Sequence, residues 1–375
     1  MDLGAYMAES IRNIMATAYL NVLGNPREAR FVAKMQRTIG RAERRRKAYL
    51  EKEGVAVPPF LIASIATTCN LQCKGCYARK NGIAGDTPTK ETLSPDQWGT
   101  IFREAAELGI SFCLLAGGEP LTQRAILEVA AATGDIIFPV FTNGTMIGAV
   151  YTEFFKHNLN LIPVISLEGE RTATDERRGN GVFQRALLSM EMLHKENLFF
   201  GTSITVTTEN YREVTSEAFL SHLAELGCRL VFYVEYVPFD ETTDHLAFRD
   251  EHVAEMEQIV EQRREQYKGM IFLSFPGDEK ALDGCMAAGR GFFHIGPDGA
   301  AEPCPFSPFS DTNAARDGLR AALASPLFHK IRNARALGWE HTGGCTLYEH
   351  RDEVKALLVT PMPPTSRTSK PLSNQ

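Results

Sequence analysis

Three cysteines, Cys69, Cys73 and Cys76, lie within the segment Thr67-Thr68-Cys69-Asn70-Leu71-Gln72-Cys73-Lys74-Gly75-Cys76-Tyr77. Thiolates are soft ligands that suit iron–sulfur clusters and zinc. Three thiolates can hold three irons of a [4Fe–4S] cube and leave the fourth iron open to a small molecule. A structural zinc site normally takes four protein ligands, and no nearby Cys or His supplies a fourth locally. The spacing therefore favours an iron–sulfur centre that performs chemistry, with zinc as the alternative.

The chain has eight cysteines in all, and their use depends on the compartment. No apolar run reaches the roughly 18 to 20 residues that span a bilayer, and the N-terminus has no secretory signal pattern. We therefore expect a cytoplasmic protein, where a reducing environment favours metal ligation or catalysis over disulfides. Cys113, within a predicted strand, and Cys228, at a helix-to-strand junction, are explained by core packing.

Polar and glycine-rich segments recur where later strands are expected to end. They are Gly117-Gly118-Glu119-Pro120, Thr142-Asn143-Gly144 and Ser166-Leu167-Glu168-Gly169. Glycines let the backbone approach a ligand closely, and Glu119 or nearby carbonyls can accept hydrogen bonds from an ammonium group. Because the loops after parallel barrel strands meet on one face, these segments are expected to face the cysteine loop.

The CxxxCxxC spacing, with Asn70 in the loop and Tyr77 after it, resembles that of radical S-adenosylmethionine (SAM) enzymes. The resemblance continues through the GGEP segment and through Asp175-Glu176-Arg177-Arg178-Gly179, and it covers about residues 60–275. It implies a [4Fe–4S] cluster on Cys69, Cys73 and Cys76. In this family the cluster passes one electron to the sulfonium of SAM, and the resulting 5′-deoxyadenosyl radical abstracts hydrogen from the substrate.

The same resemblance assigns residues to SAM. Gly117, Gly118 and Glu119 are expected to bind its methionine amino group. Ser166 and Arg178 are expected to hold its carboxylate, a contact that suits a hydroxyl and a guanidinium. The sequence departs from the family pattern at Glu168, where Asp is more frequent, and at Gly75, where an aromatic is more frequent. Neither change removes a cluster ligand.

A second set of cysteines, Cys285, Cys304 and Cys345, follows the predicted barrel. Thirteen residues separate Cys285 from Gly299, and four separate Gly299 from Cys304, with a turn predicted at residues 297–299. This spacing resembles the opening of the SPASM and twitch auxiliary domains of radical SAM enzymes. Three cysteines allow at most one auxiliary [4Fe–4S] cluster, with an open iron or a fourth ligand such as His341, Glu349 or His350. Zinc, or thiols that bind nothing, are the alternatives.

One carboxylate is a candidate acid or base. Glu235 stands near the end of a predicted strand in Tyr233-Val234-Glu235-Tyr236, where a barrel residue can point at the substrate. A carboxylate that is hydrogen-bonded within the barrel mouth explains its position equally well. Glu235 is therefore listed as a catalytic candidate with this structural alternative beside it.

Short β-rich runs alternate with helical segments from Pro58 to Phe275, which predicts an α/β fold, a partial (β/α)6 TIM-like barrel. Before it, residues 1–57 are expected to be a helical segment; after it, residues 276–355 an auxiliary domain and 356–375 a flexible tail. One helix is marked by Ser94, Pro95 and Gln97 as cap, first-turn proline and capping-box partner. The six predicted strands are 60–67, 110–116, 136–141, 161–167, 200–206 and 230–237. The other predicted barrel helices are 123–132, 183–193, 216–226 and 252–267.

The charge balance excludes one class of partner. With 40 Lys and Arg against 46 Asp and Glu, the net charge of −6 disfavours a nucleic-acid-binding surface. The basic run that includes Arg41, Arg44 and Lys47 is interpreted as a solvated helix face. No membrane partner is expected, and the family resemblance implies a reductant such as flavodoxin or ferredoxin.

Three functions are consistent with these residues. The first is a radical SAM enzyme that modifies a peptide or protein side chain, which the auxiliary-domain resemblance favours. The second is radical SAM oxidation or epimerisation of a small metabolite or cofactor precursor, since residues 1–57 lack an evident peptide-recognition module. The third is a non-catalytic zinc-binding protein.

Overall fold

The computed structural model describes residues 26–85, 91–239, 241–278, 284–333 and 345–359. The first part of the predicted N-terminal helical segment and all but the first four residues of the predicted tail lie outside these ranges. No helix in the described ranges combines the length and apolarity that a membrane span requires.

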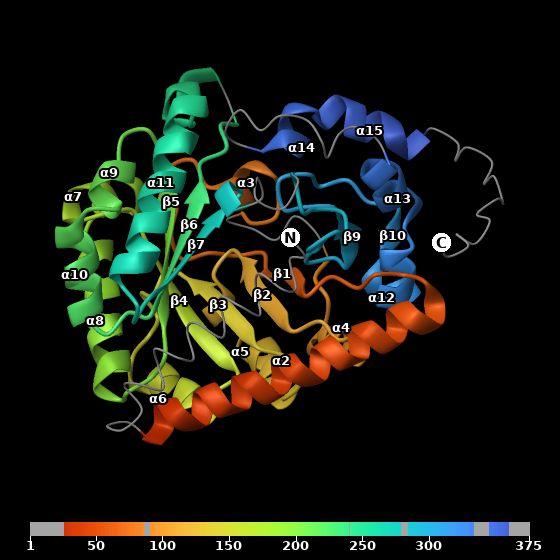
Figure 1. Ribbon diagram of the computed structural model, residues 1–375, viewed down its shortest axis with the longest axis horizontal. Helices are drawn as coiled ribbons and strands as arrows, with labels where there is room; N and C mark the ends of the chain where they lie inside the picture. Colours follow the sequence, from red (N-terminus) through yellow and green to blue (C-terminus); the bar gives the residue numbers. More distant parts are fainter. Residues whose placement is uncertain (1–25, 86–90, 240, 279–283, 334–344, 360–375) are drawn as a thin grey trace, which may run out of the picture.

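Parallel strands form the centre of the molecule (Figure 1). They follow one another in space as in sequence, from β1 to β7. The prediction of a partial α/β barrel is confirmed, and each of the six predicted strands is present with small changes of boundary. Strand β7 was not predicted; it is a short run of five residues that is followed by a cis Phe275-Pro276 bond. The bounds are β1 Phe60–Ala66, β2 Phe112–Gly117, β3 Phe138–Thr142, β4 Leu161–Leu167, β5 Gly201–Val206, β6 Leu230–Glu235 and β7 Ile271–Phe275.

Helices connect the strands and cover the outside of the sheet (Figure 1). The capping box of α4 is confirmed: the Ser94 hydroxyl accepts from Gln97 N–H, and the Gln97 side chain accepts from Ser94 N–H. In the barrel the helices are α3 Tyr77–Lys80, α4 Pro95–Leu108, α5 Arg124–Ala132, α6 Ala149–His157, α7 Arg171–Arg178, α8 Val182–Lys195, α9 Tyr211–Val214, α10 Glu217–Glu225 and α11 Asp250–Gln266. Two 3-10 turns, η2 Pro120–Thr122 and η3 Glu241–Leu246, complete the connections.

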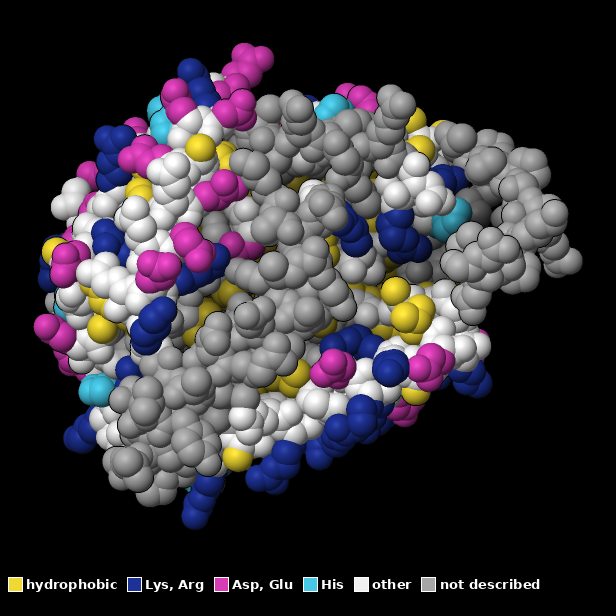
Figure 2. Space-filling view, viewed as in Figure 1, with side chains coloured by type: hydrophobic (Ala, Val, Ile, Leu, Met, Phe, Trp, Pro, Cys, Tyr) yellow, Lys and Arg dark blue, Asp and Glu magenta, His cyan; other side chains and the backbone are white. Residues whose placement is uncertain are grey.

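Helix α2, Pro26–Glu53, runs along the amino ends of the strands (Figure 1). Its buried side chains Phe31 and Met35 belong to an apolar cluster with residues of the barrel strands, and the Phe31 ring stacks on Phe199 at 4.8 Å. Part of the basic run is structural and not merely solvated: Arg45 donates to the Ala106 carbonyl and pairs with Asp135, both at 2.8 Å. Arg46 likewise donates to the Ser111 hydroxyl at 2.8 Å. Lys and Arg side chains also follow the exposed edge of the molecule along α2 (Figure 2).

The segment after β7 continues the barrel's sheet. Strand β8, His294–Ile295, pairs in parallel with β1, and β9, Ala300–Glu302, and β10, Thr312–Asn313, follow in antiparallel order. Helix α12, Ala314–Leu323, packs against α4. The remaining helices are α13 Pro326–Asn333, α14 Thr346–Glu349 and α15 Arg351–Val359. Whether residues 276–355 form a domain of their own stays a prediction, since their strands extend the barrel's sheet.

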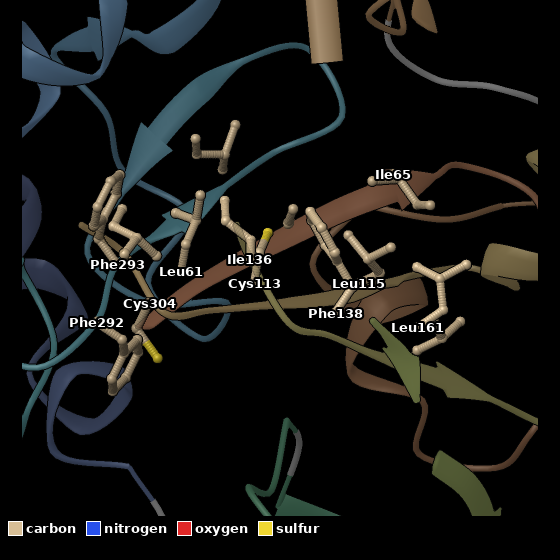
Figure 3. Close-up of a cluster of buried hydrophobic side chains, with 14 of the residues drawn as sticks. Leu61, Ile65, Cys113, Leu115, Ile136, Phe138, Leu161, Phe292, Phe293 and Cys304 are labelled. Carbon is tan, nitrogen blue, oxygen red and sulfur yellow. The ribbon is translucent and has the colours of Figure 1, made fainter. Parts of the chain in front are cut away.

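One hydrophobic core joins the barrel to this segment (Figure 3). Leu61, Cys113 and Phe138 from the barrel strands belong to the same buried cluster as Phe293 and Cys304. Cys113 and Cys228 are both fully buried, as core packing predicted. The Cys228 thiol also lies 3.2 Å from the Thr202 hydroxyl.

A buried row of hydrogen-bonded side chains crosses the junction between β1 and β8. His294 is fully buried; its Nε2 lies 2.8 Å from the Ser64 hydroxyl and its Nδ1 lies 2.7 Å from Glu302 Oε2. Both ring nitrogens therefore have partners, as a dry interior requires. These hydrogen bonds fix the C-terminal segment to the edge of the barrel.

Replacing His294 by Ala should leave the Glu302 carboxylate buried without its partner. Removing one member of a buried pair costs about 3 to 5 kcal/mol, so we expect a loss of that order in the free energy of unfolding, measured by urea denaturation. His157→Ala, at an exposed histidine on α6, is the matched control. Equal stability of the two variants would contradict a stabilising role for the buried hydrogen bonds of His294.

Candidate functional site

A cavity of about 330 Å³ opens at the carboxyl ends of the parallel strands. The structure brings most of the predicted site residues to its wall: Cys69, Cys73, Cys76, Gly117, Gly118, Glu119, Ser166 and Arg178. These residues come from the ends of β1, β2 and β4 and from helix α7. The expected meeting of the loops on one face is therefore observed.

The start of the cysteine loop lies directly against the glycines that follow β2. Gly118 N–H donates to the Ala66 carbonyl at 2.7 Å, and Glu119 N–H donates to the Thr68 carbonyl at 2.8 Å. A Cβ on Gly118 would lie 2.1 Å from the Thr68 carbonyl oxygen, which is closer than atoms can approach. Gly117 has a φ of +120°, a conformation that favours glycine. The glycines therefore position the cysteine loop as well as the cavity wall.

Two asparagines hold the other side of the loop. Asn143 Nδ2 donates to Asn70 Oδ1 at 2.8 Å, and Asn70 Nδ2 donates to the Thr145 hydroxyl at 2.9 Å. Asn143 Oδ1 accepts from Thr145 N–H at 2.9 Å. The loop after β3 thus fixes the residue next to Cys69.

Helix α7 binds the middle of the cysteine loop. Lys74 N–H donates to the Arg177 carbonyl at 2.8 Å, and Arg177 Nε donates to the Lys74 carbonyl at 3.2 Å. Beside it, Arg178 Nε donates to Glu168 Oε1 at 2.8 Å, and Glu168 is almost fully buried. The cysteine loop and the predicted carboxylate-binding arginine therefore belong to one hydrogen-bonded unit.

The charges of this unit affect the thiols. Burial raises the pKa of Cys69 and of Cys73, and the positive charge of Arg178 opposes that rise at Cys73. Burial would lower the pKa of Arg178, but the negative charges of Glu168 and Cys73 outweigh it, so the pKa of Arg178 is raised. Arg178 therefore stays cationic beside the cysteine loop and favours the thiolate form of Cys73.

Hydrogen bonds from neighbouring residues hold the Glu119 carboxylate in place. It is 1% exposed; its Oε1 accepts from the Thr142 hydroxyl at 2.7 Å and its Oε2 accepts from Asn143 N–H at 2.8 Å. Leu121 N–H also donates to Oε1 at 3.0 Å. Burial raises the pKa of Glu119, and these hydrogen bonds oppose the rise. The carboxylate thus joins the ends of β2 and β3 at the cavity wall.

The second set of cysteines gathers beside the cavity rather than in its wall. Burial raises the pKa of Cys304 well above its usual value, and a hydrogen bond with Cys345 and the charge of Cys285 add to the rise. Cys304 is followed by Pro305 and Phe306, which line the cavity. The Phe306 ring lies 5.4 Å from the Tyr77 ring, and Asn81 Nδ2 donates to the Pro305 carbonyl at 2.8 Å. Two cysteine sets that are far apart in sequence are therefore neighbours.

The structure does not bring Glu235 to the cavity. Phe232 and Val234 line the cavity from the same strand, and because side chains alternate along a strand, Glu235 faces the other side. It is 2% exposed, and a Cβ on Gly277 would lie 3.5 Å from its Oε1. The Glu235 carboxylate is therefore buried and stands outside the cavity lining.

Comparison with known proteins decides the family. Residues 63–221 match the family model of the radical SAM superfamily. The chain therefore contains a radical SAM domain over these residues. It is therefore an enzyme of radical chemistry whose cofactors are a [4Fe–4S] cluster and SAM.

Relatives and solved structures agree with this radical SAM assignment. The AdoMet-dependent heme synthase of Methanosarcina barkeri is 25% identical over 78% of the chain and 89% of that protein. The PqqA peptide cyclase of Rhizobium meliloti is 26% identical over 66% of the chain and 68% of that protein. The crystal structure of Streptococcus suis SuiB bound to the precursor peptide SuiA has a TM-score of 0.62 at 18% identity, covering 78% of the chain and 71% of SuiB. This last likeness shows the fold.

The structure explains why this radical SAM chain can have glycine where the family more often has an aromatic. Gly75 has a φ of +63°, and a Cβ there would lie 2.9 Å from the Tyr236 hydroxyl and 3.1 Å from its ring. Tyr236, directly after β6, is buried. An aromatic ring from a different part of the chain therefore packs against the cysteine loop at this point.

Sequence reasoning missed several residues of the radical SAM site. Asn143, Thr145 and Tyr236 hold the cysteine loop, and Glu168 pairs with Arg178, yet none of these was given a role. The polar Thr142-Asn143-Gly144 after a predicted strand was the available signal for Asn143. Nothing in the sequence indicates that Tyr236 packs against Gly75, because 161 positions separate them.

Replacing Gly118 by Ala should separate the two loops, because the new Cβ cannot fit against the Thr68 backbone. We expect at least a tenfold loss of SAM affinity in the anaerobically reconstituted enzyme, measured by the change in the cluster's electron paramagnetic resonance (EPR) signal on SAM titration. Gly134→Ala is the control, since a Cβ there meets nothing within 4 Å. Unchanged SAM binding by Gly118→Ala would show that the close approach is unimportant.

Proposed function

We propose that this radical SAM enzyme modifies a side chain of a peptide or protein, with its [4Fe–4S] cluster on Cys69, Cys73 and Cys76. The observation that carries the assignment of the site is that these three thiols and the predicted SAM-binding segments line one cavity. The donor set suits the cluster, since it offers three soft ligands beside the cation Arg178.

Ligand geometry disfavours the zinc alternative. A zinc ion with thiolates at about 2.3 Å needs sulfurs within about 4 Å of one another, whereas ligands of a cube bind separate irons and stand farther apart. In the part of the chain that the structure describes, no group of three His, Cys, Asp or Glu side chains is arranged to hold a metal ion. Three thiols around one cavity fit a cluster better than a single ion.

The wall of the cavity supports distinct roles toward SAM. The backbone at Gly117 and Gly118 provides carbonyls for the methionine ammonium, since the Glu119 carboxylate already accepts three hydrogen bonds. Arg178 offers its guanidinium to the carboxylate of SAM, and Glu168 orients it. Ser166 contributes a hydroxyl that lies 3.3 Å from Ser203 Oγ. The cluster and SAM would supply the one-electron radical chemistry, while these residues would hold SAM beside the cluster.

We further propose one auxiliary [4Fe–4S] cluster on Cys285, Cys304 and Cys345. Cys304 interacts with both Cys345 and Cys285, and it precedes Pro305 and Phe306 of the cavity wall. Among the suggested fourth ligands, His341 lies outside the described residues. His350 Nδ1 lies 3.2 Å from Glu353 Oε1.

A peptide substrate is supported by the relatives whose names include one, the PqqA peptide cyclase and SuiB with its precursor peptide. The alternative is a cofactor precursor, which the similarity to the AdoMet-dependent heme synthase supports. In either case a reductant such as flavodoxin or ferredoxin would supply the electron, and the cytoplasm is the proposed location.

Anaerobic reconstitution tests the assignment of the two cysteine sets. Replacing Cys69, Cys73 and Cys76 together by Ser should remove about four irons per chain and abolish formation of 5′-deoxyadenosine from SAM under dithionite. The matched variant with Ser at 285, 304 and 345 should lose a similar amount of iron but keep the SAM-dependent change in the EPR spectrum.

The proposal fails if the wild-type protein binds zinc stoichiometrically and never cleaves SAM. It also fails if both triple variants lose the SAM-dependent signal equally, because the two sets would then not be separate centres.

A further inference from the structure

The wall of the cavity is divided by chemistry. The cysteine loop and the ends of β2 to β5 give it a polar side, with Asn143, Ser166, Arg178, Ser203 and Thr205. Apolar side chains form the rest of the wall, and those on β1 to β3 are Phe60, Ile62, Leu114, Ala116 and Phe141. The opposite side comes from β6, β7 and the segment after them, and it is mostly apolar, with Ser274 and Asp278 as its polar members. Its apolar residues are Phe232, Val234, Leu273, Phe275, Met286, Phe292 and Phe306. If SAM takes the polar side, the substrate meets the apolar one.

The charged group on the apolar side is already neutralised. Asp278 accepts two hydrogen bonds from Arg264 Nη2, at 2.8 and 2.9 Å, and one from Ser274 N–H at 3.0 Å. On the polar side Arg177 and Arg178 both pair with Glu168. An ionised substrate group placed on the apolar side would lose its hydration without gaining a partner among the described lining residues.

Aromatic rings dominate this side. The Phe275 and Phe292 rings meet edge to face at 5.4 Å, and the Phe232 ring meets Phe141 in the same way at 5.4 Å. Edge-to-face and offset contacts are the arrangements that aromatic rings prefer. A further ring that enters the cavity can meet these rings in the same arrangements.

We infer that the group modified by this enzyme is an aromatic side chain, which binds against Phe232, Val234 and Phe292. This inference rests on the proposed function, since it specifies the substrate of the same site. An aromatic ring is apolar enough for this wall and flat enough to pack among its rings. Serine, glutamate or lysine side chains would leave polar atoms unpaired there.

Small probes test the inference without knowledge of the peptide sequence. The reconstituted enzyme with SAM bound is titrated with N-acetyl amides of Phe, Tyr, Trp, Ser, Glu and Lys, followed by saturation-transfer NMR. We expect the aromatic amides to bind at least tenfold more tightly than the Ser, Glu and Lys amides. Equal binding of all six amides, or preference for a charged one, would overturn the inference.

Two variants locate the binding to this wall. Val234→Thr keeps the shape of the side chain but adds a hydroxyl, so it should weaken binding of the Phe amide several-fold. The same substitution at Val150, an exposed residue of α6, is the control and should change nothing. Phe232→Leu should favour the Trp amide over the Phe amide, because it enlarges the pocket; a uniform loss for both amides would count against the ring contact.

Failure of this inference is distinguishable from failure of the proposed function. Formation of 5′-deoxyadenosine without any amide, together with the SAM-dependent EPR change, reports on the cluster and SAM alone. If both are present and a porphyrin tetracarboxylate binds while the aromatic amides do not, the site accepts a macrocycle and the aromatic side-chain inference is wrong.

Discussion

The site depends on one backbone contact, the approach of the residues after β2 to the residues after β1. Gly118 and Glu119 donate to carbonyls at Ala66 and Thr68, and no side chain fits between the two segments. The contact fixes the start of the cysteine loop with respect to the sheet. Two paired strands therefore hold the thiols in place. Asn143, after β3, and Arg177, on α7, then secure the loop from two further sides. A ligand set on a loop is thereby held almost as firmly as one on the strands.

Much of the fold and of the candidate site could be predicted, because short stretches of the sequence indicate the same elements that the whole fold contains. The alternation of strands and helices, the cap at Ser94 and the short spacing of Cys69, Cys73 and Cys76 are local patterns, and local patterns are visible in a single sequence. The six predicted strands followed from these patterns. The residues gathered at the cavity followed from the family resemblance together with the rule that parallel strands share a functional face.

The parts that could not be predicted depend on contacts between distant segments. Tyr236 meets Gly75, and Ser64 meets His294, across separations that no periodicity records. Strand β7 was missed because five residues carry little pattern. Glu235 shows the limit of placing a residue on a strand without its register: a shift of one position moves a side chain from the interior of the barrel to the outside.

The pairing of β8 with β1 also affects how the molecule can be divided. A fragment that ended after β7 would leave the peptide groups of β1 near Ile62 without the strand that now covers them, and the side chains of Leu61 and Ala63 without part of their packing. Open strand edges of this kind invite pairing with another chain. A barrel shortened at this point would therefore be prone to self-association.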